Sequence, residues 1–265
     1  IAAHSEATSW YSGPTLMAHL EGVDLDQNTG AAQEFRMPVQ WVNRPNLDFR
    51  GFSGKIAAGT IKPGDEVRIL PSGKTSHVDR IVTYDGDLDS AAAGQSITLT
   101  LNDEVDCSRG QVITAATAPL EVADQFETTL IWMDEEALIP GRSYYLKIGP
   151  QTVSATVAEP KYQINVNTME HAAAKTLDLN AIGVANITTD RDIPFAPYAE
   201  NRTLGGFILI DKMTNATVGA GLINFALRRA QNIHWQATDI THDHHANLKN
   251  QKPAVLWMTG LSGSG

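Results

Sequence analysis

The residues best suited to chemistry form a short loop at residues 260–265. The loop reads Gly260-Leu261-Ser262-Gly263-Ser264-Gly265. A phosphate-binding loop has the pattern G-x-x-x-x-G-K-[ST], in which backbone N–H groups surround the phosphate, the lysine contacts it and a hydroxyl binds Mg²⁺. Gly260 and Gly265 have the required spacing, and the lysine would follow Gly265. We therefore predict an incomplete ATP phosphate-binding loop, with a flexible glycine- and serine-rich tail as the alternative.

A strand must position such a loop, because phosphate-binding loops connect a buried strand to a helix. The apolar run Ala254–Met258 directly precedes the loop and is typical of such a strand. We predict that residues 253–265 begin a P-loop domain and that the polar residues 232–252 are a linker. We also expect this sequence to be a piece of a longer protein.

Three other groups could do chemistry, but each has a simpler structural explanation. The run His242–His245 could bind Zn²⁺ or Ni²⁺, yet in a polar linker we expect solvated side chains. Asp134–Glu136 could pair as acid and base, although adjacent carboxylates on a turn usually face water. Cys107 is the one cysteine, so the chain has no internal disulfide, and we expect a core residue. We predict no catalytic residue and no metal site.

The remaining candidates are cations and strand aromatics. The cations are Arg142, Lys147, Arg228 and Arg229. They could hold an anion or an acidic partner, but ordinary surface ion pairs are the simpler expectation. Trp41 and Trp132 occupy strand patterns, so we expect them to pack in a core or at a barrel rim.

Composition limits the class of protein. The 265 residues are 42% hydrophobic and 19% charged, enough for two domains with separate cores. A net charge of -10 argues against a nucleic-acid-binding surface. No apolar run approaches the roughly 18 residues of a membrane span, and the first residues do not resemble a signal peptide. We expect a soluble, cytoplasmic protein that binds neither nucleic acid nor membrane.

Two β-rich regions follow a short helical segment. In residues 1–24, Gly13 could cap a helix with Pro14 at its first position. Residues 25–121 show short strands separated by glycine- and proline-rich turns, the pattern of a small antiparallel barrel. The strands are expected at Phe35–Trp41, Gly54–Ala58, Glu66–Leu70, His77–Thr83, Ser96–Leu101 and Val112–Thr114. Pro38 favours an edge position for the first of them.

Residues 122–231 predict a second barrel of the same class. Its strands are expected at Gln125–Met133, Ser143–Ile148, Thr152–Pro160, Tyr162–Val166, Ile182–Thr188, Gly206–Asp211 and Thr217–Phe225. One helical turn is expected at Thr168–Lys175, capped by Asn167 with Glu170 reaching back. Asn165 and Asn167 share one side of their strand, where turn and cap roles account for them.

Several segments carry a family resemblance. Arg50–Val67 and Ala216–Ile223 resemble barrel segments of translational-type GTPases such as elongation factor Tu. A narrower resemblance, to the GTPase subunit of sulfate adenylyltransferase, rests on Trp10–Leu16, Val39–Pro45, Asn201-Arg202, Gly205–Asp211 and Phe225–Trp235. The run Gln251–Gly265 resembles the opening of adenylylsulfate kinase. The combination is similar to the bifunctional sulfate-activation enzyme.

The resemblance implies a mainly β fold with two tandem antiparallel β-barrels, as in elongation factor Tu-like GTPases. It implies that residues 1–24 end a GTPase domain outside this sequence. It also implies a full-length protein that uses GTP and ATP with Mg²⁺ for two reactions. One is GTP-coupled adenylylsulfate synthesis with a small catalytic subunit, and the other is phosphorylation of that product by the kinase domain. The barrels would contact the GTPase domain, the kinase domain and the small subunit, and alone would bind no cofactor and catalyse nothing.

Two other functions stay open from the residues. A tRNA-binding barrel module of an elongation factor-like GTPase would share the barrels, although the negative charge opposes contact with a phosphate backbone. An assembly scaffold, in which the barrels only tether the kinase to its partner, would also fit.

Overall fold

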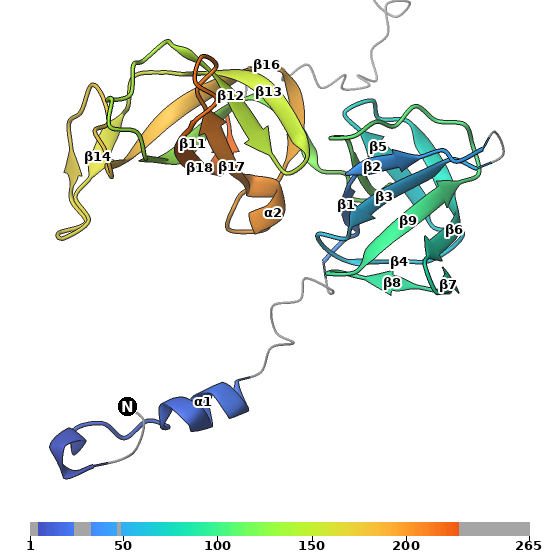
Figure 1. Cartoon of the computed structure of the whole chain (residues 1–265), viewed down its shortest axis with the longest axis horizontal. Coiled ribbons are helices and arrows are strands. Elements are labelled where there is room, and N and C mark those ends of the chain that lie inside the picture. The colour runs from blue at the N-terminus through green and yellow to red at the C-terminus, as the bar shows by residue number, and fades with distance from the viewer. Residues whose placement is uncertain (1–4, 24–32, 47–48, 228–265) are drawn as a thin grey trace, which may run out of the picture. The chain divides into compact units, whose positions relative to one another are not determined.

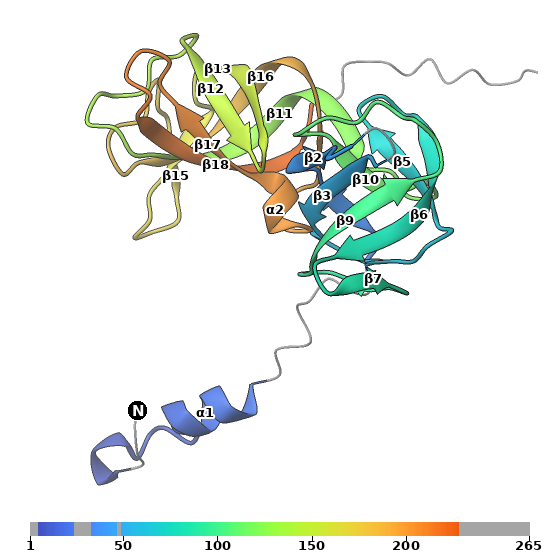
Figure 2. The same cartoon turned by 45° about the vertical axis from the view of Figure 1, so that its right-hand side comes forward.

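Alternating apolar residues build two barrels, each around a core of its own. The structure is a computed structural model that describes residues 5–23, 33–46 and 49–227. The first core contains Met37, Phe52 and Leu99, and the second contains Phe126, Leu146 and Phe195. Figures 1 and 2 show the first barrel in blue to green and the second in green to orange. The prediction of a mainly β protein with two tandem barrels is confirmed.

A short helical segment precedes the barrels in the sequence. It comprises the 3₁₀ turn η1 (Glu6–Thr8) and helix α1 (Leu16–Gly22). The predicted start of this helix is wrong by two residues, because Thr15 is the cap and its hydroxyl accepts the Ala18 amide at 3.3 Å. Gly13 has no side chain that could make this bond. Neither helix in the described part of the chain is long and apolar enough to span a bilayer.

The first barrel is a ladder of short antiparallel strands. They are β1 (Arg36–Pro38), β2 (Trp41–Asn43), β3 (Gly51–Lys55), β4 (Thr60–Ile61), β5 (Glu66–Leu70), β6 (Thr75–Thr83), β7 (Gly86–Leu88), β8 (Ala91–Ala92), β9 (Ser96–Leu101) and β10 (Val112–Ala115). The order across the sheet is β1-β10-β5-β6-β9-β3-β2, with β7 beside β6 and with β4 paired to β8. Figure 2 labels β10, which is unlabelled in Figure 1, next to its pairing partner β5.

A change of hydrogen-bonding partner closes this barrel. The Val39 amide donates to the Gln111 carbonyl at 2.8 Å, whereas the next amide, of Gln40, donates to Ser53 on β3 at 2.8 Å. Successive amides of an extended chain point to opposite sides, so one segment pairs with both ends of the sheet. The predicted single strand Phe35–Trp41 is therefore two strands, β1 and β2.

The exposure of Trp41 follows from the same change of hydrogen-bonding partner. Phe35, Met37 and Val39 are buried as the alternation predicts, but Trp41 is 63% exposed. The expectation that Trp41 packs in a core or at a rim is wrong, because the chain changes direction before reaching it. Trp132 is 2% exposed, so the same expectation is confirmed for that residue.

The second barrel closes by direct strand pairing. Its elements are β11 (Glu121–Trp132), β12 (Ser143–Ile148), β13 (Gln151–Val157), β14 (Tyr162–Ile164), β15 (His171–Ala172), β16 (Ile182–Phe195), α2 (Arg202–Gly205), β17 (Gly206–Ile210) and β18 (Thr217–Ala226). The ring runs β11-β18-β17-β12-β13-β16 and returns to β11, with β14 paired to β16 and β15 paired to β14.

The helical turn predicted at Thr168–Lys175 is wrong, because this segment belongs to a hairpin. β14 pairs with β15, so Gln163 faces Ala172 and Ile164 faces His171. The Asn165 amide donates to the Glu170 carbonyl at 2.9 Å and closes the turn. A single helical turn without an apolar face gains little stabilisation from packing. The hairpin, in contrast, adds backbone hydrogen bonds to a sheet that already exists. The turn role predicted for Asn165 is confirmed, since its side-chain oxygen accepts the Asn167 amide at 3.0 Å.

Strand β16 continues beyond its predicted end at Thr188. Thr188 faces Gln125, and Ile193 faces Ala123, so Thr189–Asp192 form an offset opposite Asp124. The polar sequence of the offset indicates a loop, but the Thr189 hydroxyl donates to the Asp124 carbonyl at 3.2 Å and keeps the strands together. Pairing then resumes as far as Glu121 and Phe195.

A third apolar cluster joins the two barrels. It contains Leu70 and Val112 from the first barrel with Leu120, Ala196 and Leu204. The Asn201 side chain lies beside this cluster and donates to the Ala57 carbonyl at 3.1 Å. We call this contact region, defined by the third cluster with Asn201 and Ala57, the seam.

Candidate functional sites in the two barrels

The predicted phosphate-binding loop lies outside the described residues. The same holds for His242–His245, Arg228 and Arg229. The assignment of Gly260–Gly265 to ATP phosphates therefore stays a prediction, as do the domain limits. Within the described residues, no group of three histidine, cysteine or acidic side chains could hold a metal ion.

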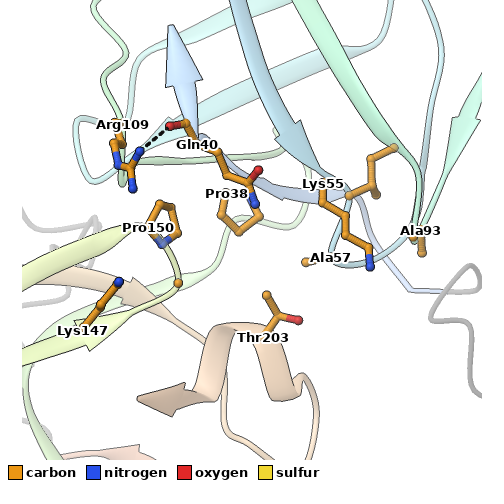
Figure 3. A pocket seen from close by; sticks show the side chains of 12 residues that line it. Pro38, Gln40, Lys55, Ala57, Ala93, Arg109, Lys147, Pro150 and Thr203 are labelled. Carbon is orange, nitrogen blue, oxygen red and sulfur yellow. Dashed lines mark hydrogen bonds between the residues drawn. The ribbon is translucent and has the colours of Figure 1, made fainter. Parts of the chain in front are cut away.

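One candidate site is a cavity of about 530 Å³ beside the seam, shown in Figure 3. It is lined by Pro38, Gln40, Lys55, Ile56, Ala57, Ala93, Gly94 and Arg109 from the first barrel, and by Lys147, Gly149, Pro150 and Thr203 from the second. Cavities of roughly 300–1,000 Å³ are the usual size for small-molecule sites. We call this cavity the seam cavity.

The charged side chains of the seam cavity are all cationic. They are Lys55 at the end of β3, Arg109 in the loop before β10, and Lys147 on β12. Arg109 Nη1 donates to the Gln40 carbonyl at 3.3 Å, which orients the guanidinium. In the part of the chain that the structure describes, none of the three forms an ion pair with a carboxylate. The expectation for Lys147 is an ordinary surface ion pair, with an anion or a partner as the alternative, and in the described residues that ion pair does not form. Lys55 and Arg109 are not among the candidates from the sequence.

A second cavity, of about 330 Å³, lies at one end of the second barrel. Asp211 and Arg142 line it and form an ion pair, with Arg142 Nη2 at 2.5 Å from Asp211 Oδ2. The ion pair expected for Arg142 forms, but Asp211 is buried, so the expectation of a surface pair is wrong. Hydrogen bonds from the Thr214 and Met213 amides, helped by the Arg142 guanidinium, hold the pKa of Asp211 below its ordinary value.

The acidic run Asp134–Glu136 borders this second cavity. Glu135 and Glu136 are exposed, and Asp134 Oδ1 accepts the Glu136 amide at 3.1 Å. Trp132 Nε1 donates to the Glu136 carbonyl at 2.6 Å. The run is a turn whose backbone is tied to a core tryptophan, which agrees with the predicted structural role.

Cys107 is a core residue, as predicted. It is 2% exposed and belongs to the core of the first barrel. Burial raises the pKa of its thiol to about 12. A thiol reacts as its thiolate, so this side chain is protonated and unreactive near neutral pH.

Family comparisons match the two barrels separately. Residues 52–114 match the family of elongation factor Tu domain 2, and residues 125–224 match the GTP-eEF1A C-terminal domain-like family. The first match covers strands β3 to β10, and the second covers most of β11 to β18. The resemblance to elongation factor Tu-like barrels is confirmed.

Sequence relatives extend over the whole chain. It is 55% identical to the bifunctional enzyme NodQ of Rhizobium sp. (strain N33) over all 265 residues. It is 47% identical over 223 residues to sulfate adenylyltransferase subunit 1 of Aliivibrio salmonicida (strain LFI1238), a match that covers 84% of this chain. The chain is a homologue of these proteins. It spans 41% of the length of that NodQ and 46% of that subunit 1.

A solved structure shares the fold. The crystal structure of sup35 complexed with GDP superposes with a TM-score of 0.70 and covers 83% of this chain and 53% of its own, at 21% sequence identity. At this identity the likeness concerns the fold alone.

Proposed function

We propose that this chain is the two-barrel region of a bifunctional sulfate-activating enzyme. The first reaction joins sulfate to ATP, forming adenylylsulfate and releasing pyrophosphate, and GTP hydrolysis drives this uphill step. In the second reaction a kinase transfers the γ-phosphoryl group of another ATP to the 3′-hydroxyl of adenylylsulfate. The observation that carries the proposal is the 55% identity to a bifunctional NodQ along the entire chain, residues 228–265 included.

The barrels have a mechanical role in this proposal. In the described residues no three histidine, cysteine or acidic side chains gather as a metal-binding group, and the thiol of Cys107 is buried and protonated. Their seam is a small apolar cluster with a hydrogen bond across it, from Asn201 to Ala57. Such a contact suits two rigid units that pass a nucleotide-dependent movement from a GTPase domain to a partner. The chain alone would be catalytically silent.

The kinase reaction would begin at Gly260–Gly265. The backbone amides of this loop would hold the phosphates of ATP, and bound Mg²⁺ would neutralise charge on the transferred phosphoryl group. A small catalytic subunit would perform the adenylylation. The complete protein would work in the cytoplasm, without nucleic acid or membrane.

The test uses the complete protein that contains this chain, purified together with a small adenylyltransferase subunit. We expect pyrophosphate release from ATP and sulfate to depend on GTP, and we expect phosphorylation of added adenylylsulfate. Gly265→Asp should abolish only the second activity, since a carboxylate would repel the ATP phosphates. Gly22→Asp, at an exposed position with open space around it, is the matched control.

Three results would contradict this proposal. The first is adenylylsulfate synthesis that is indifferent to GTP. The second is a Gly265→Asp variant with full kinase activity. The third is tight binding of tRNA in a filter assay at low salt, which would favour the elongation factor-like alternative.

A further inference from the structure

The seam cavity concentrates positive charge on an acidic protein. The whole chain has a net charge of -10, yet Lys55, Arg109 and Lys147 are the charged residues that line this cavity. A cleft lined by one sign of charge focuses its field and raises the local concentration of oppositely charged ligands. The cavity therefore selects anions although the molecule as a whole repels them.

The placement of the cations favours a long anion over a single small one. In Figure 3 the Arg109 and Lys147 side chains lie at one end of the cavity, and the Lys55 ammonium lies toward the other end. Pro38 and Pro150 lie between them. A single phosphate or sulfate ion at one end would leave the cation at the other end unpaired, whereas a chain of linked phosphates would reach both.

Neutral donors complete the lining. The Thr203 hydroxyl and the Gln40 amide are available in the wall, and Gly94 and Gly149 let the backbone approach a ligand closely. Arg109 has five N–H donors in a fixed fork, and one of them already bonds Gln40. The other N–H groups of such a fork are arranged so that they can bond two oxygens of one phosphate.

We propose that the seam cavity binds a polyphosphate anion, either inorganic or as the phosphates of a nucleotide, and that the bound anion links the two barrels. Lys55 and Arg109 belong to the first barrel, and Lys147 belongs to the second, so the ligand adds an ionic bridge to the apolar seam. This inference is independent of the proposed sulfate activation, because it concerns binding to these barrels alone.

Calorimetric titration of the chain at low salt tests the binding. The probes are tripolyphosphate, pyrophosphate, orthophosphate, ATP and adenosine. We expect affinity to rise from orthophosphate to tripolyphosphate and to fall steeply with added salt, since the contacts are ionic. ATP binding with no adenosine binding assigns the contacts to the phosphates. ATP binding tighter than tripolyphosphate identifies a nucleotide as the ligand, and equal affinities identify the inorganic chain.

Matched variants locate the site. Lys55→Gln and Lys147→Gln should each weaken tripolyphosphate binding by about tenfold, the effect of losing one charge-assisted contact. Lys74→Gln removes the same charge from an exposed turn outside the cavity and should leave the affinity unchanged. Unfolding midpoints without ligand should agree among all three variants, because these lysines have no structural ion pair in the described residues.

The thermal midpoint of unfolding gives a second measurement of the anion that is proposed to link the two barrels. A ligand that binds only the folded chain stabilises it by an amount that grows with the logarithm of the ligand concentration divided by Kd, so tripolyphosphate should raise the thermal midpoint of wild type more than that of either cavity variant. The proposal is overturned by an absence of binding at millimolar tripolyphosphate. It is also overturned if Lys74→Gln weakens binding as much as Lys147→Gln, or if a polyglutamate peptide binds more tightly than tripolyphosphate.

Discussion

The side-chain amide of Asn201 donates a hydrogen bond of 3.1 Å across the seam to the carbonyl of Ala57. Its oxygen accepts the Thr203 and Leu204 amides at 3.0 and 3.1 Å and so caps α2. One side chain therefore fixes the start of a helix in the second barrel and a contact with the first. Asn201 is itself buried, which removes competing water from both sets of bonds.

Asn201→Ala should reduce the free energy of unfolding by about 1–3 kcal/mol, since it removes a cap and leaves the partly buried Ala57 carbonyl without its donor. Asn201→Ser keeps an oxygen for the cap but is too short to reach Ala57, so it should cost only about 0.5–1.5 kcal/mol. Urea unfolding followed by circular dichroism measures both. Equal stability of wild type and the serine variant would show that the bond across the seam contributes nothing.

Asp211 should make the free energy of unfolding depend on pH in the acid range. The Thr214 and Met213 amides and Arg142 lower the pKa of this carboxyl in the folded state, whereas the unfolded value is about 3.9. Its stabilisation is therefore complete above the unfolded pKa and is lost as pH falls through the lower folded pKa.

The measurement compares urea midpoints of wild type and Asp211→Asn between pH 6 and pH 2. The asparagine oxygen can still accept the two amides, but it has no charge to lose. We expect the variant to be less stable near pH 6 and the two curves to converge at the acid end. Parallel curves would mean that the Asp211 carboxyl does not titrate differently in the two states.

Cys107 should resist alkylation in the folded chain. With a pKa of about 12, the thiolate fraction at pH 8 is far below that of a free thiol with a pKa near 8.5, and burial also blocks access. Labelling by iodoacetamide, followed by mass spectrometry, should be at least about 100-fold slower in buffer than in urea. Because this is the one cysteine of the sequence, the label reports a single site. Fast labelling of the folded chain would place the thiol at the surface.

Replacing Trp132 by alanine should destabilise the fold far more than replacing Trp41. Trp132 is buried against Tyr144, with ring centroids 5.8 Å apart, and donates to the Glu136 carbonyl. Trp132→Ala should cost about 3–5 kcal/mol. Trp41→Ala, at a site 63% exposed, should stay within about 0.5 kcal/mol of wild type. Chemical unfolding measures the difference, and similar costs for the two would contradict their assigned environments.

Strand periodicity predicted most of the fold. β5, β9 and β12 have the predicted bounds, since each is a short alternating run between clear turn residues. The errors arise where long-range pairing overrides local pattern. Nothing near Val39 or Gln40 indicates that adjacent amides pair with different strands, and that pairing alone exposes Trp41. Likewise, only the partner strand reveals that His171 lies in a hairpin and that β16 continues to Phe195.

The seam cavity could be predicted only in part. Lys147 is noticeable as a cation on an alternating strand, but Lys55 and Arg109 resemble ordinary surface residues in the sequence. Their proximity to Lys147 depends on how Asn201 and Leu204 hold the two barrels together, and that contact has no local sequence signal. The loop at Gly260–Gly265 is the opposite case, because the spacing of its glycines is a local sequence signal that the described residues do not test.

The long pairing of β11 with β16 has a mechanical consequence. At Glu121 and Phe195 this ribbon reaches the residues of the seam, and at Gly183 it holds the β14–β15 hairpin. A force applied to the hairpin is therefore carried along backbone hydrogen bonds toward the first barrel. The offset of Thr189–Asp192 opposite Asp124 interrupts that ladder, so bending should concentrate there and make this point the elastic joint of the second barrel.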